Sequence, residues 1–461
     1  MQRDFVVNPA HYSLPTDTIV ALASARGRSG VGTIRVSGPA VPLIAQAISG
    51  QLPPPRQATL RTFKDAQGEA IDRGLVLYFP APGSYTGEPV LELQAHGGPV
   101  VLEMLISACE VQGARRARPG EFSLRAFLNG RLDLAQAEAV ADLIDAGSVA
   151  GARAALRSLS GEFSLAVSAF KNRLIALRVQ IEAGIDFADE HLELEADQRL
   201  YLATESLAAD LEEFTRKAQA GRMLHDGWVV VIAGRPNAGK SSLLNRLCGH
   251  DTAIVSDVPG TTRDVLRERV IIDGVPVEFI DTAGLRDNPE PIEAEGIRRA
   301  RTELGRADHV FYLVDASDAA ALSNASAEIQ ALNLSVSCSV LYTKMDQAPV
   351  PSIRFERPYV TLGISVLGAD GLSALNTHLS ELLQSKDRDE GTFSARARHV
   401  TSLHQSERYV ANAVRLIQER AGMELIAEEL SIAQAALNQV TGEFTNDDLL
   451  GEIFSSFCIG K

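Results

Sequence analysis

The stretch that most constrains this chain is Trp228–Ser242, because it places a strand, a glycine loop and a helix start in immediate succession. Its first residues are apolar and mostly β-branched, which predicts a buried strand. Gly234–Ser241 then matches the pattern G-x-x-x-x-G-K-S/T, and leucines at helical spacing follow it. Such a loop directs its backbone N–H groups at phosphate, so the sequence predicts a nucleotide-binding loop. In that loop we expect Lys240 to contact the outer phosphates and the Ser241 hydroxyl to bind Mg²⁺.

Length, charge and cysteine content narrow the class of protein. A chain of 461 residues corresponds to about three domains, and its net charge of −15 argues against binding nucleic acid over the whole surface. Any RNA contact therefore needs a local patch or a partner protein. The four cysteines are scattered and form no C-x-x-C pair, which argues against a zinc site and fits a reducing cytosol. With no signal-peptide core and no run of about 18 apolar residues, we expect a soluble cytoplasmic protein without a membrane partner.

Residues 1–128 are expected to form an α+β domain, because short apolar runs alternate with turn-rich segments. The expected strands are Thr18–Leu22, Thr33–Val36, Leu75–Phe79 and Val90–Gln94, and the expected helix is Val100–Glu110. Gly27–Gly32 resembles a nucleotide loop but lacks the acidic residue of a dinucleotide fingerprint, so we favour a plain turn. His96-Gly97-Gly98 follows a strand, so a catalytic role for His96 stays open, although a structural turn is the favoured interpretation.

Residues 129–222 and 388–461 carry helical stripes of apolar residues on both sides of the nucleotide domain. The stripes, at steps of three and four, are Phe163, Val167, Phe170, Leu174, Leu177 and Ile181, then Leu200, Leu207, Leu211 and Phe214, and finally Val410, Val414, Ile417, Ile426, Leu430, Ala433 and Leu437. Because neither half is expected to bury its stripe alone, we favour one helical bundle that the nucleotide domain interrupts. Two unrelated helical domains are the alternative.

Residues 223–387 are expected to form the inserted α/β domain, with a mostly parallel sheet. Ser256–Asp264 supplies threonines, which a mobile loop uses to bind Mg²⁺ and to sense a γ-phosphate. Asp273-Gly274 lies between two apolar runs and is a strong hairpin signal. The second run leads into Asp281–Gly284. Here the Asp281 carboxylate suits a position near Mg²⁺, and the backbone amide of Gly284 suits a contact with the γ-phosphate.

Further buried strands lead into residues that select the base. Val336–Tyr342 runs into Thr343–Asp346, and Val360–Ile364 runs into Ser365. The final Asp of a Lys-x-Asp motif can accept hydrogen bonds from guanine N1–H and its 2-amino group, a pair that adenine lacks, so Asp346 predicts a guanine nucleotide. This ordered series resembles the motifs of translation-factor-like GTPases, with Thr343 in place of the usual Asn and able to make one of its contacts. The residues expected to bind GTP are Asn237, Ala238, Gly239, Lys240, Ser241, Ser242, Ser256, Thr261, Thr262, Asp281, Thr282, Ala283, Gly284, Thr343, Lys344, Asp346 and Ser365.

Motifs outside the nucleotide domain extend the resemblance to essentially the whole chain. They are PGEFSLRAFLNGRLDLAQAEA at Pro119–Ala139 and GEFTNDDLLGEIFSSFCIGK at Gly442–Lys461, beside DTAGLR at Asp281–Arg286. Together they resemble the bacterial tRNA modification GTPases of the MnmE, or TrmE, family. The resemblance implies a homodimer through the N-terminal domain and a heterotetramer with MnmG, which alone binds FAD. It also implies that the two proteins install an aminomethyl or carboxymethylaminomethyl group at carbon 5 of the wobble uridine in certain tRNAs.

The same resemblance implies that the N-terminal domain binds a tetrahydrofolate derivative, in its 5,10-methylene or 5-formyl form, as the source of one carbon. The family's folate contacts fall on Arg35, Glu92, Arg131 and Lys461. The cations suit a glutamate tail and the carboxylate suits pterin N–H donors. Arg131 stands where some members have lysine, which keeps the charge but changes the geometry. Cys458 matches a family cysteine, for which packing beside the folate and a covalent role are both open.

For hydrolysis the resemblance implies K⁺ in place of an arginine finger, with two GTPase domains meeting across their switch faces. A cation there neutralises transition-state charge between the phosphates. The expected K⁺ ligands are Asn237, Ser256, Val258 and Thr261, and the expected Mg²⁺ ligands are Ser241 and Thr262. The expected catalytic residues are Lys240 and Glu293, the latter matching the glutamate that orients the attacking water. From the residues alone, Glu293 is an ordinary solvated side chain in an acidic loop.

Two other functions stay open at this point. A GTPase switch in ribosome assembly usually carries a basic RNA-binding appendage, whereas this chain has an acidic balance and an additional α+β domain. A scaffold that uses GTP only to control its dimerisation is the second alternative.

Overall fold

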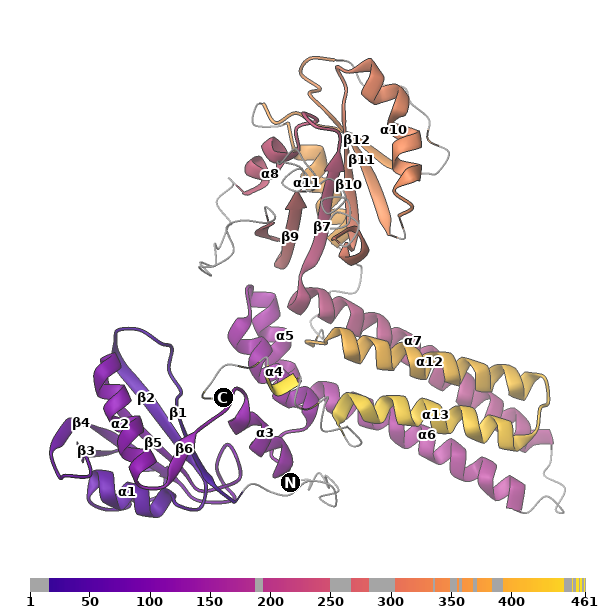
Figure 1. Ribbon diagram of the computed structural model, residues 1–461. Coiled ribbons are helices and arrows are strands. Elements are labelled where there is room, and N and C mark those ends of the chain that lie inside the picture. Colours follow the sequence, from indigo (N-terminus) through magenta and orange to yellow (C-terminus); the bar gives the residue numbers. More distant parts are fainter. Residues whose placement is uncertain are drawn as a thin grey trace, which may run out of the picture. The chain divides into compact units, whose positions relative to one another are not determined.

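The computed structural model describes residues 16–186, 194–248, 267–281, 303–334, 336–348, 355, 359–367, 371–383, 393–442, 450, 453–455, 457 and 460. The chain divides into two compact units, whose elements are labelled in Figure 1. The first unit contains residues 1–144, 156–213 and 401–461, and the second contains residues 145–155 and 214–400. The division falls inside four helices, α4 (Leu134–Asp145), α5 (Val149–Leu159), α7 (Leu194–Asp226) and α12 (Ala397–Gln418). The predicted domain bounds at residues 128, 222 and 387 stay predictions.

The first unit contains a mixed, mainly antiparallel sheet. Its strands are β1 (Thr18–Leu22), β2 (Ser29–Ser37), β3 (Thr59–Lys64), β4 (Ala70–Phe79), β5 (Val90–Gly97) and β6 (Ala114–Arg116), in the order β3-β4-β5-β2-β1-β6. Helices α1 (Val41–Ser49) and α2 (Pro99–Val111) cover one face through a core that includes Val20, Ile34 and Leu105. On the other face, Ile19 and Ala21 pack against Phe122 of α3 (Glu121–Leu128). All the predicted elements of this domain are confirmed, while β3, β6, α1 and α3 were not predicted.

The segment predicted as a turn at Gly27–Gly32 belongs partly to β2, which begins at Ser29 rather than Thr33. Ser29 pairs with Gly97 and Gly32 with Ala95, with a register shift between the two pairs. A Cβ at position 32 would approach a Leu102 methyl carbon to 2.6 Å, so a larger residue there would displace the Leu102 side chain. The close approach of α2 therefore explains the glycine, and a strand with many small polar residues gave too weak an apolar pattern to be predicted.

The helical segments on either side of the second unit pack together. They comprise α4 (Leu134–Asp145), α6 (Glu162–Asp186), α13 (Met423–Thr441) and parts of α7 and α12. Arg178 of α6 donates to Gln434 of α13 at 2.8 Å, and Gln418 of α12 donates to Tyr201 of α7 at 2.9 Å. The predicted apolar stripe of α6 is buried along its length. These contacts confirm one helical bundle with an inserted domain, and not two unrelated helical domains.

The second unit contains a sheet that is parallel except for one edge strand. Its strands are β7 (Trp228–Gly234), β8 (Arg267–Ile272), β9 (Val275–Asp281), β10 (His309–Asp315), β11 (Ser337–Thr343) and β12 (Val360–Gly363), in the order β12-β11-β10-β7-β9-β8. Only β8 runs antiparallel to its neighbour within this sheet. Asp273 and Gly274 both have positive φ, as the predicted two-residue hairpin requires.

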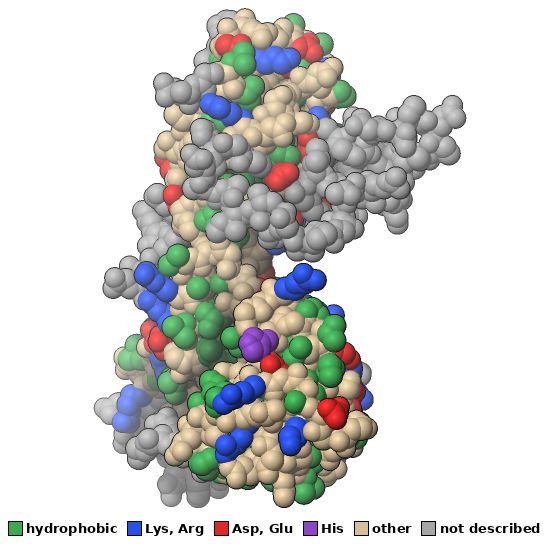
Figure 2. Space-filling view, turned by 90° about the vertical axis from the view of Figure 1, so that its left-hand side faces the viewer, with side chains coloured by type: hydrophobic (Ala, Val, Ile, Leu, Met, Phe, Trp, Pro, Cys, Tyr) green, Lys and Arg blue, Asp and Glu red, His purple; other side chains and the backbone are tan. Residues whose placement is uncertain are grey.

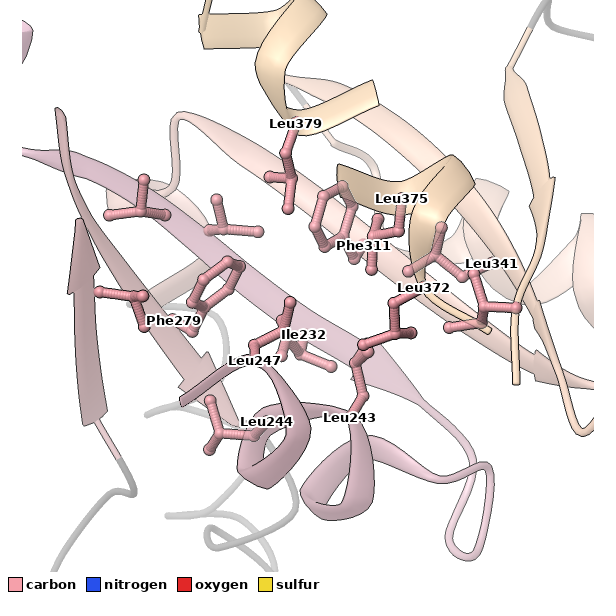
Figure 3. Packing of buried hydrophobic residues seen from close by; sticks show 14 of the residues in the cluster. Ile232, Leu243, Leu244, Leu247, Phe279, Phe311, Leu341, Leu372, Leu375 and Leu379 are labelled. Carbon is pink, nitrogen blue, oxygen red and sulfur yellow. The ribbon is translucent and has the colours of Figure 1, made fainter. Parts of the chain in front are cut away.

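Helices cover both faces of this parallel sheet. Leu243 and Leu247 of α8 (Lys240–Cys248) and Leu375 of α11 (Ser373–Leu383) pack on Phe279 and Phe311 (Figure 3). The buried side chains of α10 (Ala319–Ala331) pack on the opposite face. The predicted fold class, an α/β domain with a mostly parallel sheet beside α+β and helical parts, is therefore confirmed. Of the helices that the structure describes, none has the length and apolar character needed to span a bilayer.

Candidate functional site

The glycine loop between β7 and α8 has the backbone shape that its sequence predicts. Gly234, Asn237 and Gly239 all have positive φ, at 141°, 64° and 90°. A Cβ at Gly234 would come within 2.5 Å of the Leu313 carbonyl oxygen on β10, so only glycine fits there. Asn is among the few other residues that tolerate the left-handed region. The loop therefore turns sharply at the carboxyl end of β7 and delivers the chain to the start of α8.

Lys240, the first residue of α8, folds back over this loop. Its Nζ donates hydrogen bonds to the carbonyl oxygens of Gly234 at 2.9 Å and Arg235 at 2.8 Å, and the side chain is almost fully buried. The loop thus surrounds the Lys240 ammonium group at the N-terminus of α8. The ammonium charge and the positive end of the helix dipole both favour binding of an anion there. Ala238 is buried, whereas Asn237 and Ser242 are exposed.

Ser241 and Asp281 meet where two neighbouring strands end. Because β7 and β9 are adjacent and parallel, Asp281 at the end of β9 lies beside the helix that follows β7. The Ser241 hydroxyl donates to Asp281 Oδ2 at 2.8 Å, and Asp281 is fully buried. A hydroxyl oriented by a carboxylate suits Mg²⁺, which prefers oxygen ligands and keeps several of its waters. Among the described residues, no cluster of three or more His, Cys, Asp or Glu side chains offers a different metal site.

The residues predicted to select the base gather at the ends of β11 and β12. The Ser365 hydroxyl donates to Asp346 Oδ1 at 2.7 Å, and this hydrogen bond lowers the pKa of Asp346 below its usual value. The carboxylate is therefore ionised and accepts hydrogen bonds over the physiological pH range. Lys344 has positive φ, and its ammonium contacts Asp315 at 2.5 Å. The buried hydroxyl of Thr343 donates to the Ala238 carbonyl oxygen at 2.9 Å, which links this region to the glycine loop.

The structure also brings together two of the residues predicted to bind folate. Arg35 and Glu92 lie opposite one another on β2 and β5, and the guanidinium contacts the carboxylate at 2.9 Å. Arg35 lies over the rings of Tyr85 and Phe122, at 5.5 and 5.9 Å from their centroids. Arg131 lies beside Gly87, so closely that a Cβ added to that glycine would lie 3.3 Å from Arg131 Cγ. Both arginines therefore border one short loop, residues 84–88.

The C-terminal segment lies within the same unit. Phe454 and Phe457 pack with Phe127 and Leu134, and a Cβ on Gly460 would come within 2.1 Å of the Leu22 carbonyl oxygen. The backbone at Gly460 therefore touches the end of β1, in the N-terminal sheet that carries Arg35.

Comparisons with known proteins agree over almost the whole chain. Residues 18–131 match the family model described as the GTP-binding protein TrmE N-terminus, and residues 134–458 match the MnmE helical domain. The tRNA modification GTPase MnmE of Alkalilimnicola ehrlichii is 52% identical over 451 residues, which cover 96% of this chain and 99% of that protein. Those of Ectopseudomonas mendocina and Nitrosococcus oceani are 49% and 47% identical, over 96% and 97% of this chain and 99% and 97% of theirs. The chain belongs to the MnmE family of tRNA modification GTPases.

Membership of the MnmE family makes this chain a GTP hydrolase that acts in tRNA modification. Among solved structures, the G domain of the T. maritima FeoB iron transporter is 24% identical, with a TM-score of 0.27, and covers 34% of this chain and 99% of that one. Figure 2 shows Lys and Arg side chains lying among acidic and hydrophobic ones on one face of the molecule.

Several predicted site residues of this MnmE-family chain lie outside the described residues. They are Ser256, Val258, Thr261, Thr262, Thr282, Ala283, Gly284, Glu293, Cys458 and Lys461. Their assigned roles stay predictions. His96 and Gly97 end β5, and Gly98 is the N-cap of α2, an arrangement that fits the favoured interpretation of this motif as a structural turn.

The sequence did not predict the residues that fix the glycine loop to α10. Arg235 in the loop contacts Glu328 of α10 at 2.5 Å, and the Tyr312 hydroxyl donates to the same carboxylate at 2.6 Å. Burial raises the pKa of Glu328, but its contacts with Arg235 and Tyr312 outweigh burial, so the pKa lies below its usual value. The ionised carboxylate therefore anchors a loop residue that the motif leaves unspecified.

Proposed function

We propose that this MnmE-family chain acts with the FAD-binding protein MnmG to install an aminomethyl or carboxymethylaminomethyl group at carbon 5 of the wobble uridine of certain tRNAs. The chain forms a homodimer, and two copies of each protein form a heterotetramer. GTP hydrolysis drives a K⁺-dependent dimerisation cycle of the inserted domain. GTP binding is best supported by the contacts around the glycine loop. Lys240 donates to the loop carbonyl of Gly234, and the neighbouring Ser241 donates to Asp281. Thr343 donates to the loop carbonyl of Ala238, and Asp346, three residues later, accepts from Ser365.

Guanine is the base that the contacts of Asp346 favour. An ionised carboxylate offers two acceptors, which match the N1–H and 2-amino donors of guanine. Ser365 occupies part of this carboxylate and fixes its orientation. Thr343 takes the position of the usual Asn and bonds the loop carbonyl of Ala238, so it connects the base region to the phosphate region as an Asn side chain would.

For hydrolysis, this chain's residues hold the phosphates and orient the attacking water. Lys240 is placed to contact the outer phosphates once it exchanges its loop carbonyl partners for them. Ser241 and Thr262 would hold Mg²⁺, and Asp281 orients the Ser241 hydroxyl. Asn237, with backbone oxygens of Ser256 and Val258 and with Thr261, would hold K⁺, which supplies positive charge between the phosphates. Glu293 is assigned to orienting the water.

The N-terminal domain is assigned the one-carbon carrier. A tetrahydrofolate carries a pterin ring whose N–H groups suit Glu92 and, at its other end, an anionic glutamate tail that suits cations. Because Arg35 contacts Glu92 at 2.9 Å, we assign both to the pterin end of the site, which leaves Arg131 and Lys461 for the tail.

Nucleoside analysis of tRNA tests this function directly. In a strain that lacks the gene, the modified wobble uridine should be lost, and the gene for the wild-type chain should restore it. Genes encoding Ser241→Ala and Arg35→Ala should not restore it, because the first removes a Mg²⁺ ligand and the second a folate contact. An unchanged wobble uridine in the deletion strain would reject tRNA modification, and ribosomal subunits accumulating there would instead favour ribosome assembly.

A further inference from the structure

The loop at residues 84–88 lies between the two arginines of the proposed folate site. Tyr85 presents its ring to the Arg35 guanidinium at 5.5 Å. Two residues later, Gly87 has positive φ and packs against the Arg131 side chain. Each arginine therefore touches a different residue of the same loop: Arg35 through its guanidinium and Arg131 through the aliphatic part of its side chain.

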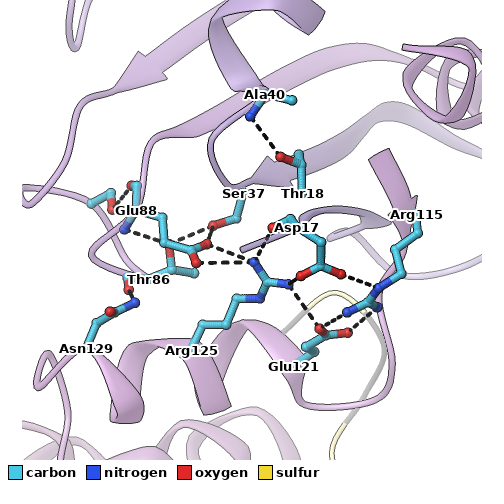
Figure 4. A network of polar contacts seen from close by, with 11 residues as sticks. Asp17, Thr18, Ser37, Ala40, Thr86, Glu88, Arg115, Glu121, Arg125 and Asn129 are labelled. Carbon is cyan, nitrogen blue, oxygen red and sulfur yellow. Dashed lines mark hydrogen bonds and ion pairs between the residues drawn. The ribbon is translucent and has the colours of Figure 1, made fainter. Parts of the chain in front are cut away.

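Helix α3 and the turn after it hold this loop through three polar contacts, and Figure 4 draws those made by Thr86 and Glu88. The Tyr85 hydroxyl and the Ser123 hydroxyl are 2.7 Å apart. Asn129 Nδ2 donates to the Thr86 carbonyl oxygen at 2.7 Å. Arg125 Nη1 lies 3.2 Å from both carboxylate oxygens of Glu88. The loop thus has a partner on α3, or directly after it, at three of its five positions.

Arg125 is the centre of this network, and its side chain is fully buried. Besides Glu88, it donates to the carbonyl oxygen of Asp17 and to its carboxylate, both at 2.8 Å, and to the Glu121 carboxylate at 3.2 Å. A buried guanidinium is tolerated only when it is paired and hydrogen-bonded. The partners of Arg125 come from three separate segments, so its guanidinium ties Glu88 to α3 and to Asp17, although its Nε has no hydrogen-bond partner among the described residues.

Glu88 also binds the strand that carries Arg35. Its Oε2 accepts a hydrogen bond from Ser37 Oγ at 2.6 Å, and the same Ser37 Oγ lies 2.7 Å from Thr86 Oγ1. Ser37 follows Arg35 by two residues on β2, so both side chains point to the same face of the sheet. One carboxylate therefore connects α3, the loop and the strand of the proposed folate site.

We propose that Glu88 and Arg125 are positioning residues for the one-carbon carrier: they hold loop 84–88 so that Tyr85 and Gly87 support Arg35 and Arg131 in the folate site. This inference rests on the proposed folate function of the N-terminal domain. Neither residue is assigned a contact with the ligand itself. The network preorganises the two cations, which lowers the ordering cost of binding.

Binding of 5-formyl-tetrahydrofolate to the full chain, measured by isothermal titration calorimetry, tests the inference. Glu88→Gln keeps the size of the side chain and leaves Arg125 two carboxylate partners, so we expect a folded protein. Its dissociation constant should rise about tenfold or more, while GTP hydrolysis stays at the wild-type rate.

Tyr85→Phe, which loses only the hydroxyl contact to Ser123, should show a smaller rise. The matched control is Glu103→Gln, because Glu103 is an exposed partner of Arg116 in the same domain and outside the network; its affinity should not change.

A double-mutant cycle separates positioning from general stability. If Glu88 acts through Arg35, Glu88→Gln should weaken binding much less in an Arg35→Lys background than in the wild type. Equal effects in the two backgrounds would overturn the inference. So would a Glu88→Gln dissociation constant within about twofold of wild type while Arg35→Ala loses binding. If the wild-type chain does not bind the folate, or Arg35→Ala binds it equally well, the folate function fails and the inference fails with it.

Discussion

The hydroxyl of Thr343 donates a hydrogen bond to the carbonyl oxygen of Ala238 at 2.9 Å, and so joins the last residue of β11 to the glycine loop. Both groups are buried, which makes the loss of one partner costly to the other. The residue that departs from the usual GTPase pattern is therefore part of the frame that holds the loop.

Replacing Thr343 should weaken nucleotide binding according to whether the new side chain can donate this bond. Thr343→Val keeps the shape but leaves the Ala238 carbonyl without its donor, a cost of about 1–3 kcal/mol, so affinity for a fluorescent GDP analogue should fall about tenfold. Thr343→Ser and Thr343→Asn retain a donor and should stay near the wild-type value. Equal affinities for the Val and Ser variants would show that the bond does not support the loop.

The nucleotide preference should follow the side chain at position 346. Asp346→Asn replaces one carboxylate acceptor by an N–H₂ donor, which opposes the 2-amino group of guanine but suits the 2-oxygen of xanthine. We expect the ratio of GTP to XTP hydrolysis, compared by kcat/KM, to fall at least about 100-fold, since sites built on hydrogen bonds discriminate strongly against mismatched donors. Ser365→Ala should lower the rate with GTP without creating a preference for XTP. If the Asp346→Asn enzyme still prefers GTP, the base must bind elsewhere.

Local patterns predicted the parts of this molecule that are built from neighbours in sequence. The strand, loop and helix around Gly234–Ser241 and the hairpin at Asp273-Gly274 needed only periodicity and turn chemistry. Contacts between distant residues were not predictable in this way. Thr343 and Ala238 are separated by 105 positions, and their contact depends on the order of strands in the sheet. Nothing in the sequence around Arg125 shows that its partners come from three different segments.

Stability of the second unit should fall in mild acid because of a buried histidine. His309 contacts the hydroxyls of Ser337 and Ser339 at 2.6 and 2.9 Å, and Ser339 contacts His378 at 2.8 Å. Burial, reinforced by His378, lowers the pKa of His309 to about 4. The folded unit therefore favours neutral His309, whereas the unfolded chain protonates it near pH 6.5. This contribution to stability is fully present above about pH 6.5 and is lost as the pH falls towards about 4, by about 2 kcal/mol of unfolding free energy at about pH 5.

The single tryptophan makes this prediction easy to measure. Trp228 stacks on His309 with ring centroids 5.5 Å apart, so its fluorescence during urea unfolding reports this unit. The unfolding free energy should be lower at pH 5 than at pH 7.5 in the wild type, and His309→Gln should reduce the difference. His404→Gln is the control, because His404 is half-exposed on α12. If His309→Gln shows the full wild-type difference, other groups cause the acid sensitivity.

Hydrolysis should depend on K⁺ through Asn237. This residue has a φ of 64° in the glycine loop, so an Ala substitution would add backbone strain, whereas Gly accepts that conformation. Asn237→Gly therefore removes the amide oxygen and leaves the shape of the loop unchanged.

In wild type, exchanging K⁺ for Na⁺ should slow GTP hydrolysis at least about tenfold, because the smaller ion fits the oxygen ligands less well and less transition-state charge is neutralised. Asn237→Gly should be slow in both salts and nearly insensitive to the exchange, with nucleotide affinity retained. Equal wild-type rates in K⁺ and Na⁺ would reject a potassium site, and a variant that keeps the full K⁺ response would remove Asn237 from it.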